Sequence, residues 1–208
     1  MPHRLITAAL LLLGACGCAR HAPAGASTAA AAAGATGSAP TLSDAPRCLA
    51  DGSGYLRLRG GGALDLDIDW KDPALECEGS PRPDQHGLRL SFAGGEPGGK
   101  HRPRLVLGLE AAPGGGTLHA VPANVTLILE GEDRLFSTRG DNRCTVDELV
   151  QTPISDGAPG SGTRAWRVTG RGFCTSPAAS LDGREHLLIS RFDFAGRAID
   201  AEPGDHSK

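Results

Sequence analysis

The feature that most constrains the fold is a two-residue repeat of apolar residues from Tyr55 onward. In Leu64–Trp70, leucine, isoleucine and tryptophan alternate with three aspartates, and Leu105–Leu109 and Val125–Leu129 have the same spacing. Successive side chains of a β-strand point to opposite faces, so this period predicts strands with one buried face. A helix would instead need apolar residues every three or four positions. We therefore expect an all-β fold.

Turn residues divide the rest of this region into further short strands. Clusters of glycine, proline, aspartate and asparagine separate the alternating segments Leu88–Phe92, Arg134–Thr138, Trp166–Phe173 and His186–Phe194. Many short strands with one polar face indicate an antiparallel β-sandwich or barrel, here of about 8–10 strands with little helix. The best helix signal is the capping-box pattern of Thr145–Glu148, but a strand beginning at Cys144 fits that segment equally well.

The aromatic residues gather late in the chain, at Trp166, Phe173, Phe192 and Phe194. The alternating pattern places them in the core, where truncating one ring to alanine typically costs about 3–5 kcal/mol. Alternation therefore argues against an exposed aromatic platform for sugars.

The N-terminus carries the pattern of an export signal. A positively charged start is followed by the apolar run Leu5–Leu13, two small residues and a cysteine. The run is much shorter than the roughly 20 residues of a membrane-spanning helix, so we expect residues 1–15 to be a signal that is removed. The motif Leu13–Cys16, with the sequence Leu-Gly-Ala-Cys, resembles the lipobox of bacterial lipoproteins, which are cut before a cysteine that receives lipid.

The resemblance to the lipobox implies that Cys16 is the lipidation site and the mature N-terminus. Gly17, rather than an aspartate, follows this cysteine, which in such lipoproteins favours the outer membrane. We therefore expect a membrane anchor through the N-terminal lipid, with the folded part facing the periplasm. The alternatives are a soluble periplasmic protein, cut by an ordinary signal, and exposure at the cell surface.

Three regions follow the signal. Residues 16–45 are rich in alanine, glycine and proline, bury too little apolar surface to become ordered, and are expected to be a disordered tether. The alternating pattern fills residues 46–200, which we expect to fold as one β-rich domain. Residues 201–208 are expected to be a disordered tail.

Two of the six cysteines, Cys16 and Cys18, precede the predicted domain. The other four predict two disulfides, because exported chains meet an oxidising compartment, and the lack of a Cys-x-x-Cys motif argues against a metal site. Four cysteines allow three pairings. We favour Cys48–Cys77 and Cys144–Cys174, since segments close in sequence tend to lie side by side in a β-meander. Cys18 would then remain unpaired.

Composition and motifs argue against several ligand classes. The net charge is −3, and no basic patch is interleaved with aromatic residues, so we expect no nucleic-acid binding. Gly94–Lys100 has the glycine and lysine spacing of a phosphate-binding loop, but His101 replaces the required hydroxyl residue. No helix start follows it, so we expect no nucleotide. We also expect no other cofactor.

No metal site is expected, although one weak calcium pattern occurs. The alternating aspartates of Asp65–Asp69, followed by Glu76, have the spacing of an EF-hand loop, but Trp70 stands where that loop needs glycine. A strand with a solvated acidic face explains these aspartates better. The alternative is calcium bound by Asp69 and Asp72 at the end of that strand.

Loops on a rigid scaffold are where binding residues gather. The candidate interaction loop is the turn that contains Arg139, Gly140, Asp141 and Asn142. Two further candidate loops are Arg82–His86 and Gly94–Arg102.

No set of catalytic residues stands out. The acidic pairs Glu130/Glu132 and Asp182/Glu185 are of the type used in glycoside hydrolysis, but exposed charge is the usual explanation of such pairs.

Together these features predict a lipid-anchored envelope lipoprotein with a non-enzymatic binding or structural role, whose partner is a periplasmic protein or the cell wall. One alternative is an inhibitor or immunity-like protein that acts against a periplasmic hydrolase. Another is a hydrolase of cell-wall or glycan material, which would need carboxylates from separate strands to converge in a pocket.

Overall fold

The computed structural model describes residues 47–84, 86–95, 102–155 and 163–201, which all belong to one structural unit within Pro40–Lys208. The expected signal and tether, and the tail beyond Ala201, lie outside these residues. In the part of the chain that is described there are eleven strands and no helix, which confirms the all-β prediction. The strands are β1 (Tyr55–Gly62), β2 (Leu66–Lys71), β3 (Leu75–Pro81), β4 (Leu88–Gly94), β5 (Arg102–Leu109), β6 (Gly116–Glu130), β7 (Arg134–Ser137), β8 (Cys144–Ile154), β9 (Thr163–Cys174), β10 (Ala178–Ser180) and β11 (His186–Ala201).

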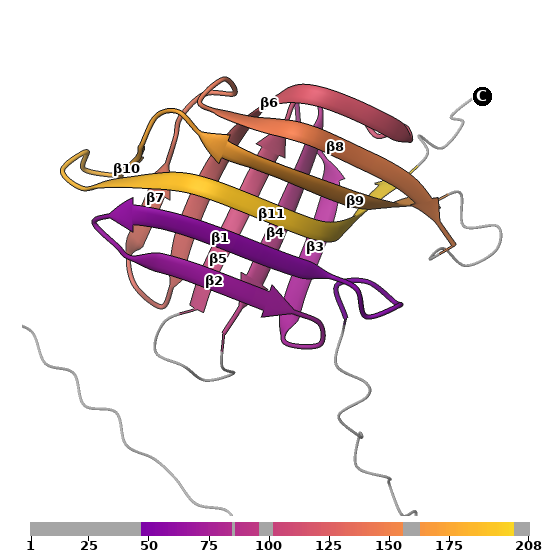
Figure 1. Cartoon of the computed structure of the whole chain (residues 1–208), viewed down its shortest axis with the longest axis horizontal. Coiled ribbons are helices and arrows are strands. Elements are labelled where there is room, and N and C mark those ends of the chain that lie inside the picture. The colour runs from indigo at the N-terminus through magenta and orange to yellow at the C-terminus, as the bar shows by residue number, and fades with distance from the viewer. Residues whose placement is uncertain (1–46, 85, 96–101, 156–162, 202–208) are drawn as a thin grey trace, which may run out of the picture. The chain divides into compact units, whose positions relative to one another are not determined.

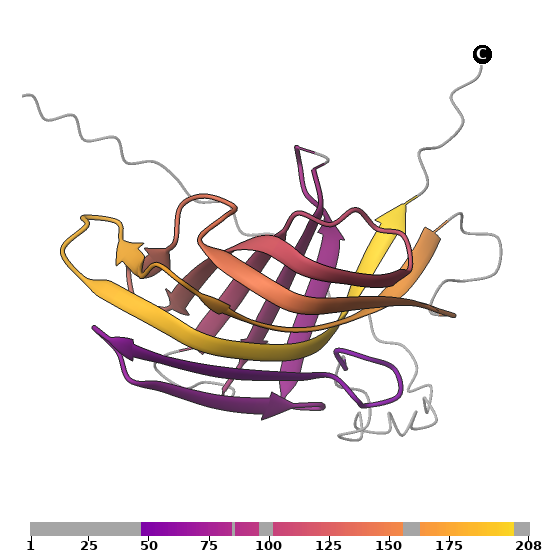
Figure 2. The same ribbon diagram turned by 45° about the horizontal axis from the view of Figure 1, so that its top comes forward.

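The strands form two crossed layers. The front layer has the order β2-β1-β11-β9-β8-β6, and the rear layer has the order β3-β4-β5-β6-β7-β10. In Figure 1 the front strands run across the steeply inclined rear strands, and Figure 2 shows the same two layers after a turn. Crossed layers of this kind are an orthogonal β-sandwich.

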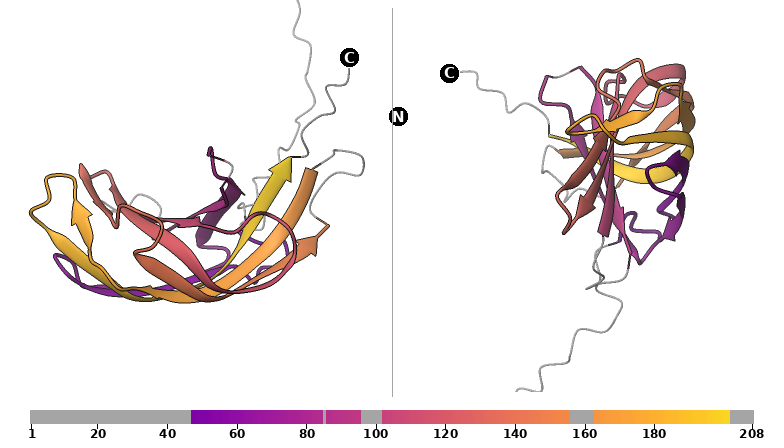
Figure 3. Two further views of the ribbon diagram at one scale, coloured as in Figure 1. Left: turned by 90° about the horizontal axis from the view of Figure 1, so that it is seen from above. Right: turned by 90° about the vertical axis from the view of Figure 1, so that its left-hand side faces the viewer.

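Two long strands belong to both layers and close one side of the sandwich. The first half of β6 pairs with β8 and its second half with β5 and β7. Likewise, β11 pairs with β10 at its start and with β1 and β9 further along. The ring β6-β8-β9-β11-β10-β7 is therefore continuous in its hydrogen bonding, and its curvature is visible in Figure 3. This side of the sandwich is barrel-like.

A local irregularity lets β6 change layers. Ala120 has a φ of 51°. On β8, Asp147 lies opposite Ala120 and falls at a shift in the register between β8 and β9. Asp147 is an extra residue of β8 against β9, and an extra residue in a ladder bends its strand and increases the local twist. The bend comes shortly before Ala123, where pairing of β6 passes from β8 to β5.

Leucines and phenylalanines fill the space between the layers. The fully buried rings are Phe92, Phe136, Phe192 and Phe194. Inward-facing glycines leave room for them: a Cβ atom added to Gly196 would lie 2.8 Å from the ring of Phe92, and one added to Gly172 would lie 2.8 Å from the ring of Phe192. Since Cβ atoms do not approach a ring so closely without a shift of the surroundings, these positions need glycine.

The expectation that all the late aromatic residues lie in the core is wrong for Phe173, which is 39% exposed. Its neighbours Gly172 and Cys174 are buried and take the inward positions of β9, so Phe173 between them faces outward. Trp166 is only half-buried. The segment Thr145–Glu148, for which a helix and a strand were both open, lies within β8.

Both disulfides link segments that are close in sequence. Cys48–Cys77 joins the segment before β1 to β3, and Cys144–Cys174 joins directly opposed residues of β8 and β9. This is the pairing that sequence proximity favours. Two disulfides indicate an oxidising compartment outside the cytoplasm. Among the described residues no helix is long and apolar enough to cross a membrane.

Candidate functional site

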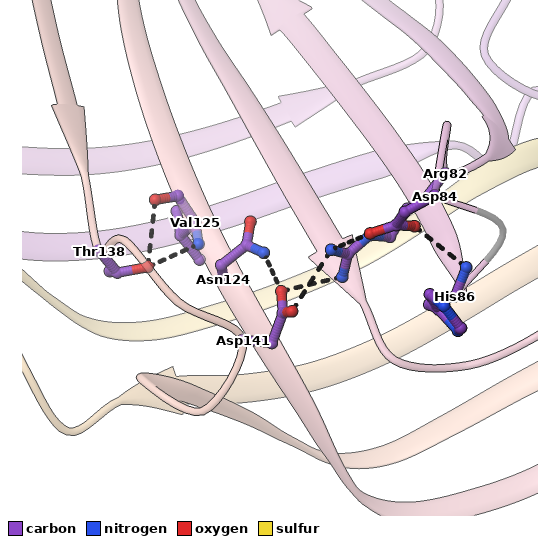
Figure 4. Close-up of polar contacts among 7 residues, drawn as sticks. All are labelled: Arg82, Asp84, His86, Asn124, Val125, Thr138 and Asp141. Atoms are coloured by element: carbon purple, nitrogen blue, oxygen red, sulfur yellow. Dashed lines mark hydrogen bonds and ion pairs between the residues drawn. The ribbon is translucent and has the colours of Figure 1, made fainter.

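An ion pair joins the candidate interaction loop to the loop after β3. Arg82 donates to both carboxylate oxygens of Asp141, at 2.9 and 3.3 Å, as Figure 4 shows. The same guanidinium group contacts the carboxylate of Asp84 at 2.8 Å. The side chain of Arg82 is only 16% exposed, so its contacts are largely shielded from solvent. The structure thus brings together two loops that are separate candidates in the sequence.

Strand β6 holds the other side of the interaction loop. Asn124 donates a hydrogen bond from its amide to Asp141. The backbone N–H of Thr138 donates to the carbonyl of Val125, and the hydroxyl of Thr138 accepts from the Val125 N–H, each at 3.0 Å. Figure 4 shows Asp141 between Asn124 and Arg82. The loop is therefore anchored from two directions.

The charges of this cluster stabilise one another. Hydrogen bonds from Arg82 hold the pKa of Asp141 below its ordinary value, and Asn124 adds to this effect while partial burial opposes it. The same contacts with Asp141 raise the pKa of Arg82. For Asp84, the backbone N–H of His86 is the main cause of a lowered pKa, and Arg82 contributes too. Both acids are therefore ionised at neutral pH.

The exposed part of the interaction loop is its tip. Arg139 and Gly140 have φ values of 48° and 116°, which turn the chain sharply. Arg139, Gly140 and Asn142 are exposed, whereas Asp141 is half-buried and held by its two partners. Asp141 is therefore a structural residue of the loop, and Arg139 is the charged group that a partner can reach.

An open hollow of about 580 Å³ borders the ion pair. Three acids line it, Asp84, Glu110 and Asp141, together with His86. Two of these acids are already bound to Arg82. The hollow therefore does not present the pair of free carboxylates that glycoside hydrolysis uses.

The acids considered for hydrolysis elsewhere in the chain also have partners. The contacts are Glu130 with Arg104, Glu132 and Glu185 with Arg134, and Asp182 with the hydroxyl of Ser180. Arg134 lies between two of these acids, at 3.6 and 3.1 Å. These contacts tie Glu130 at the end of β6, and the other three acids in the turns, to neighbouring side chains.

The calcium candidates Asp69 and Asp72 do not converge on one position. Asp69 lies 3.6 Å from Arg57 and 3.5 Å from Lys71 on the outer face of the front layer. Among the described residues, no three His, Cys, Asp or Glu side chains are grouped so that they could hold a metal ion.

Asp72 organises the start of the folded domain instead. Its carboxylate accepts three backbone hydrogen bonds, from Cys48 at 2.7 Å, Leu49 at 3.2 Å and Gly54 at 2.8 Å. Carboxylates that accept several backbone N–H groups form strong, charge-assisted contacts. Asp72 therefore fixes the segment before β1 beside the Cys48–Cys77 disulfide.

A row of alternating charges crosses the outer face of the front layer. Strand register places Arg57 between Asp69 and Asp193, and Arg171 between Asp193 and Glu148. The charge row, as we call it, consists of Asp69, Arg57, Asp193, Arg171 and Glu148, one residue from each of five adjacent strands. Opposite charges on neighbouring strands stabilise the pairing by roughly 0.2–1 kcal/mol each.

From the sequence, only the acidic part of this face on β2 could be predicted. Sequence reasoning identified the aspartates of β2 as a solvated acidic face, but it missed the arginines that face them. The available signal was the alternation of Arg57 and Arg59 with buried leucines in β1, directly before the aspartates of β2. Two consecutive strands joined by a short turn place such residues opposite one another.

No family model, no curated protein and no solved structure matches this chain. The lipidation candidate Cys16 and most of the candidate loop Gly94–Arg102 lie outside the described residues.

Proposed function

We propose that this protein is a lipid-anchored envelope lipoprotein whose β-sandwich faces the periplasm and has a non-enzymatic binding or structural role. The observation that carries the proposal is the pair of disulfides in a chain that begins with a lipobox-like motif. Disulfides persist in oxidising compartments, and the motif Leu13–Cys16 accounts for delivery to such a compartment and for attachment there through Cys16.

The position of the first disulfide suits a tethered domain. Cys48 follows the predicted tether almost directly, and its bond to Cys77 leads into β3. A pull on the tether is therefore transmitted covalently to β3 and does not peel β1 and β2 from the sheet. The three backbone hydrogen bonds to Asp72 support the same segment.

The anchored loops provide the surface for a periplasmic protein partner. Arg82 and Asp141 lock the interaction loop against the loop after β3, so the exposed tip around Arg139 is held in one conformation. A surface that is ordered before binding loses less conformational entropy in the complex.

Labelling with radioactive palmitate in a bacterial host tests the anchor. Wild type and the matched control Cys18→Ser are expected to incorporate the label and to fractionate with the outer membrane. Cys16→Ser is expected to lose the label and release the domain from the membrane. Unchanged labelling of Cys16→Ser would refute the lipoprotein assignment.

Affinity capture from envelope extract tests the binding surface. The full chain is compared with Arg139→Ala and with Arg184→Ala, a control that removes an arginine whose side chain is 86% exposed in another loop. Loss of a specific captured protein only with Arg139→Ala is the expected result. Equal capture by all three would exclude this loop as the contact surface.

A further inference from the structure

Beside the charge row, the cross-strand pair of Arg59 and Arg191 breaks the alternation of charge, as the pair of Arg167 and Arg197 does further along β11. Arg59 on β1 lies opposite Asp67 on β2 and opposite Arg191 on β11. Two like charges directly opposite each other on antiparallel strands repel and weaken the pairing. Arg59 forms an ion pair with Asp67 at 3.3 Å, whereas Arg191 forms none with any other residue that the structure describes.

The local backbone is built around this pair. The register between β1 and β11 shifts between Arg59 and Gly60, so Ser190 is an extra residue whose hydroxyl donates to the Arg59 carbonyl at 3.2 Å. A Cβ atom on Gly60 would lie 2.8 Å from the carbonyl oxygen of Leu188, so the irregularity depends on glycine. Bulges of this kind re-aim side chains and are frequent beside functional sites.

An open hollow of about 350 Å³ lies over the pair. Its charged lining consists of Arg57, Arg59 and Arg191 with Asp67 and Asp69, which leaves one positive charge in excess. Arg57 is already held by aspartates on both sides, at 3.6 Å each. Within this lining Arg191 is therefore the arginine that has no acidic partner among the described residues, and a hollow of this volume falls in the range of small-molecule sites.

We propose that this hollow binds a phosphate monoester, with the guanidinium groups of Arg59 and Arg191 donating to its oxygens from two neighbouring strands. Arginine matches phosphate in geometry through paired N–H groups, and a dianion between the two arginines removes their repulsion. This inference deepens the proposed binding role and rests on it, but it does not depend on the lipid anchor.

The phosphate has two chemical sources, a soluble sugar phosphate or a lipid headgroup. Leu188 bears on this choice because it lies three residues from Arg191 on β11 and is 41% exposed. Leu188 is not part of the lining of the hollow, so an acyl chain that extends beyond the hollow could cover it, whereas a sugar phosphate held within the hollow would leave it in water. Binding of the two kinds of ligand is therefore expected to differ in its dependence on Leu188.

Isothermal titration of the full chain, as it is purified from the host in a non-ionic detergent, tests the proposal. The probes are glucose 1-phosphate, dihexanoyl phosphatidic acid and uncharged glucose. Wild type is expected to bind at least one phosphate probe and not glucose, with affinity that falls as salt is added. Arg59→Gln and Arg191→Gln are each expected to weaken binding at least about tenfold, because a charge-assisted contact is lost.

Two further variants sharpen the result. Arg89→Gln changes an exposed arginine on β4 of the rear layer and is expected to bind as wild type does. Leu188→Ser is expected to weaken binding of the lipid probe alone if the natural source is a headgroup, and to leave both probes unaffected if it is a soluble phosphate. Without ligand, Arg191→Gln is expected to unfold at the same urea concentration as wild type or a higher one, since repulsion is relieved.

The inference is overturned if wild type binds neither phosphate probe, if Arg191→Gln binds as tightly as wild type, or if Arg191→Gln alone destabilises the fold. Failure of the lipid anchor is a different result. If palmitate labelling does not depend on Cys16, the titration result still stands. If labelling is normal but neither phosphate probe binds, only the phosphate site is refuted.

Discussion

The contact between Arg82 and Asp141 is expected to stabilise the folded state by about 1 kcal/mol. Exposed ion pairs contribute roughly 0.2–1 kcal/mol, and an unpaired buried charged partner costs about 1–3 kcal/mol. This pair lies between those cases, because the side chain of Arg82 is 16% exposed and that of Asp141 is 34% exposed. The single changes Arg82→Gln and Asp141→Asn should each cost about 1–2 kcal/mol, and a double-mutant cycle should return a coupling of about 1 kcal/mol.

The dependence on pH follows from the lowered pKa of Asp141. Since Arg82 holds this pKa below its value in the unfolded chain, the carboxylate adds stability above the unfolded pKa and loses it as pH falls through the folded one. The stability difference between wild type and Asp141→Asn is therefore complete at neutral pH and shrinks below about pH 4.

Urea unfolding followed by tryptophan fluorescence, with the disulfides intact, measures both effects. The matched control is Arg89→Gln, whose ion pair with Glu78 is long at 4.0 Å and whose side chains are 45% and 71% exposed. It should change stability by less than about 0.5 kcal/mol. A coupling near zero at neutral pH, or a cost for Asp141→Asn that persists unchanged in acid, would refute the role given to this ion pair.

Two other substitutions test the packing of the sandwich. Gly196→Ala places a methyl group 2.8 Å from the ring of Phe92 and is expected to lower the free energy of unfolding by about 1–3 kcal/mol. The control Gly61→Ala, whose Cβ meets no atom within 4 Å, should leave that free energy unchanged. Equal urea midpoints for the two variants would contradict the packing. Replacing Cys144 and Cys174 together by alanine opens a loop with a sequence separation of 30. The free energy of unfolding is expected to fall by about 3–4 kcal/mol on the chain-entropy model. A urea midpoint equal to that of wild type would show that the pairing of β8 with β9 does not need the disulfide.

The strands could be predicted from the sequence because their signal is local: apolar residues recur at every second position. Burial of one face imposes the alternation of Leu105–Leu109 and Val125–Leu129 whatever the rest of the chain does. The pairing of β1 with β11 could not be predicted, since it joins residues more than a hundred positions apart. The packing of the two layers, in which Phe92 of β4 fits against Gly196 of β11, also joins residues far apart in the sequence, and no local pattern carries that information.

The candidate site likewise has one part that the sequence predicts and one part that it does not. The turn at Arg139–Asn142 is local and was expected, but its contact with Arg82 depends on how β3 and β7 are placed in the rear layer. For Phe173, the sequence predicts the wrong face of the strand. Its hydrophobicity predicts burial, but the need for glycine at the neighbouring inward position, Gly172, sets the face to which its ring points.

Two neighbouring rows of charged side chains on the outer face of the front layer can be compared with each other. In the charge row, every arginine lies between acids, as expected where charges serve only to set strand register. The neighbouring row lies on the same outer face of strands β2, β1 and β11, yet it places Arg59 against Arg191. Strand pairing alone therefore accounts for the first row and not for the second. A local conflict of this kind is expected where a ligand supplies the missing charge, which is why Arg191, and not the better-paired Arg57, is the decisive residue to change.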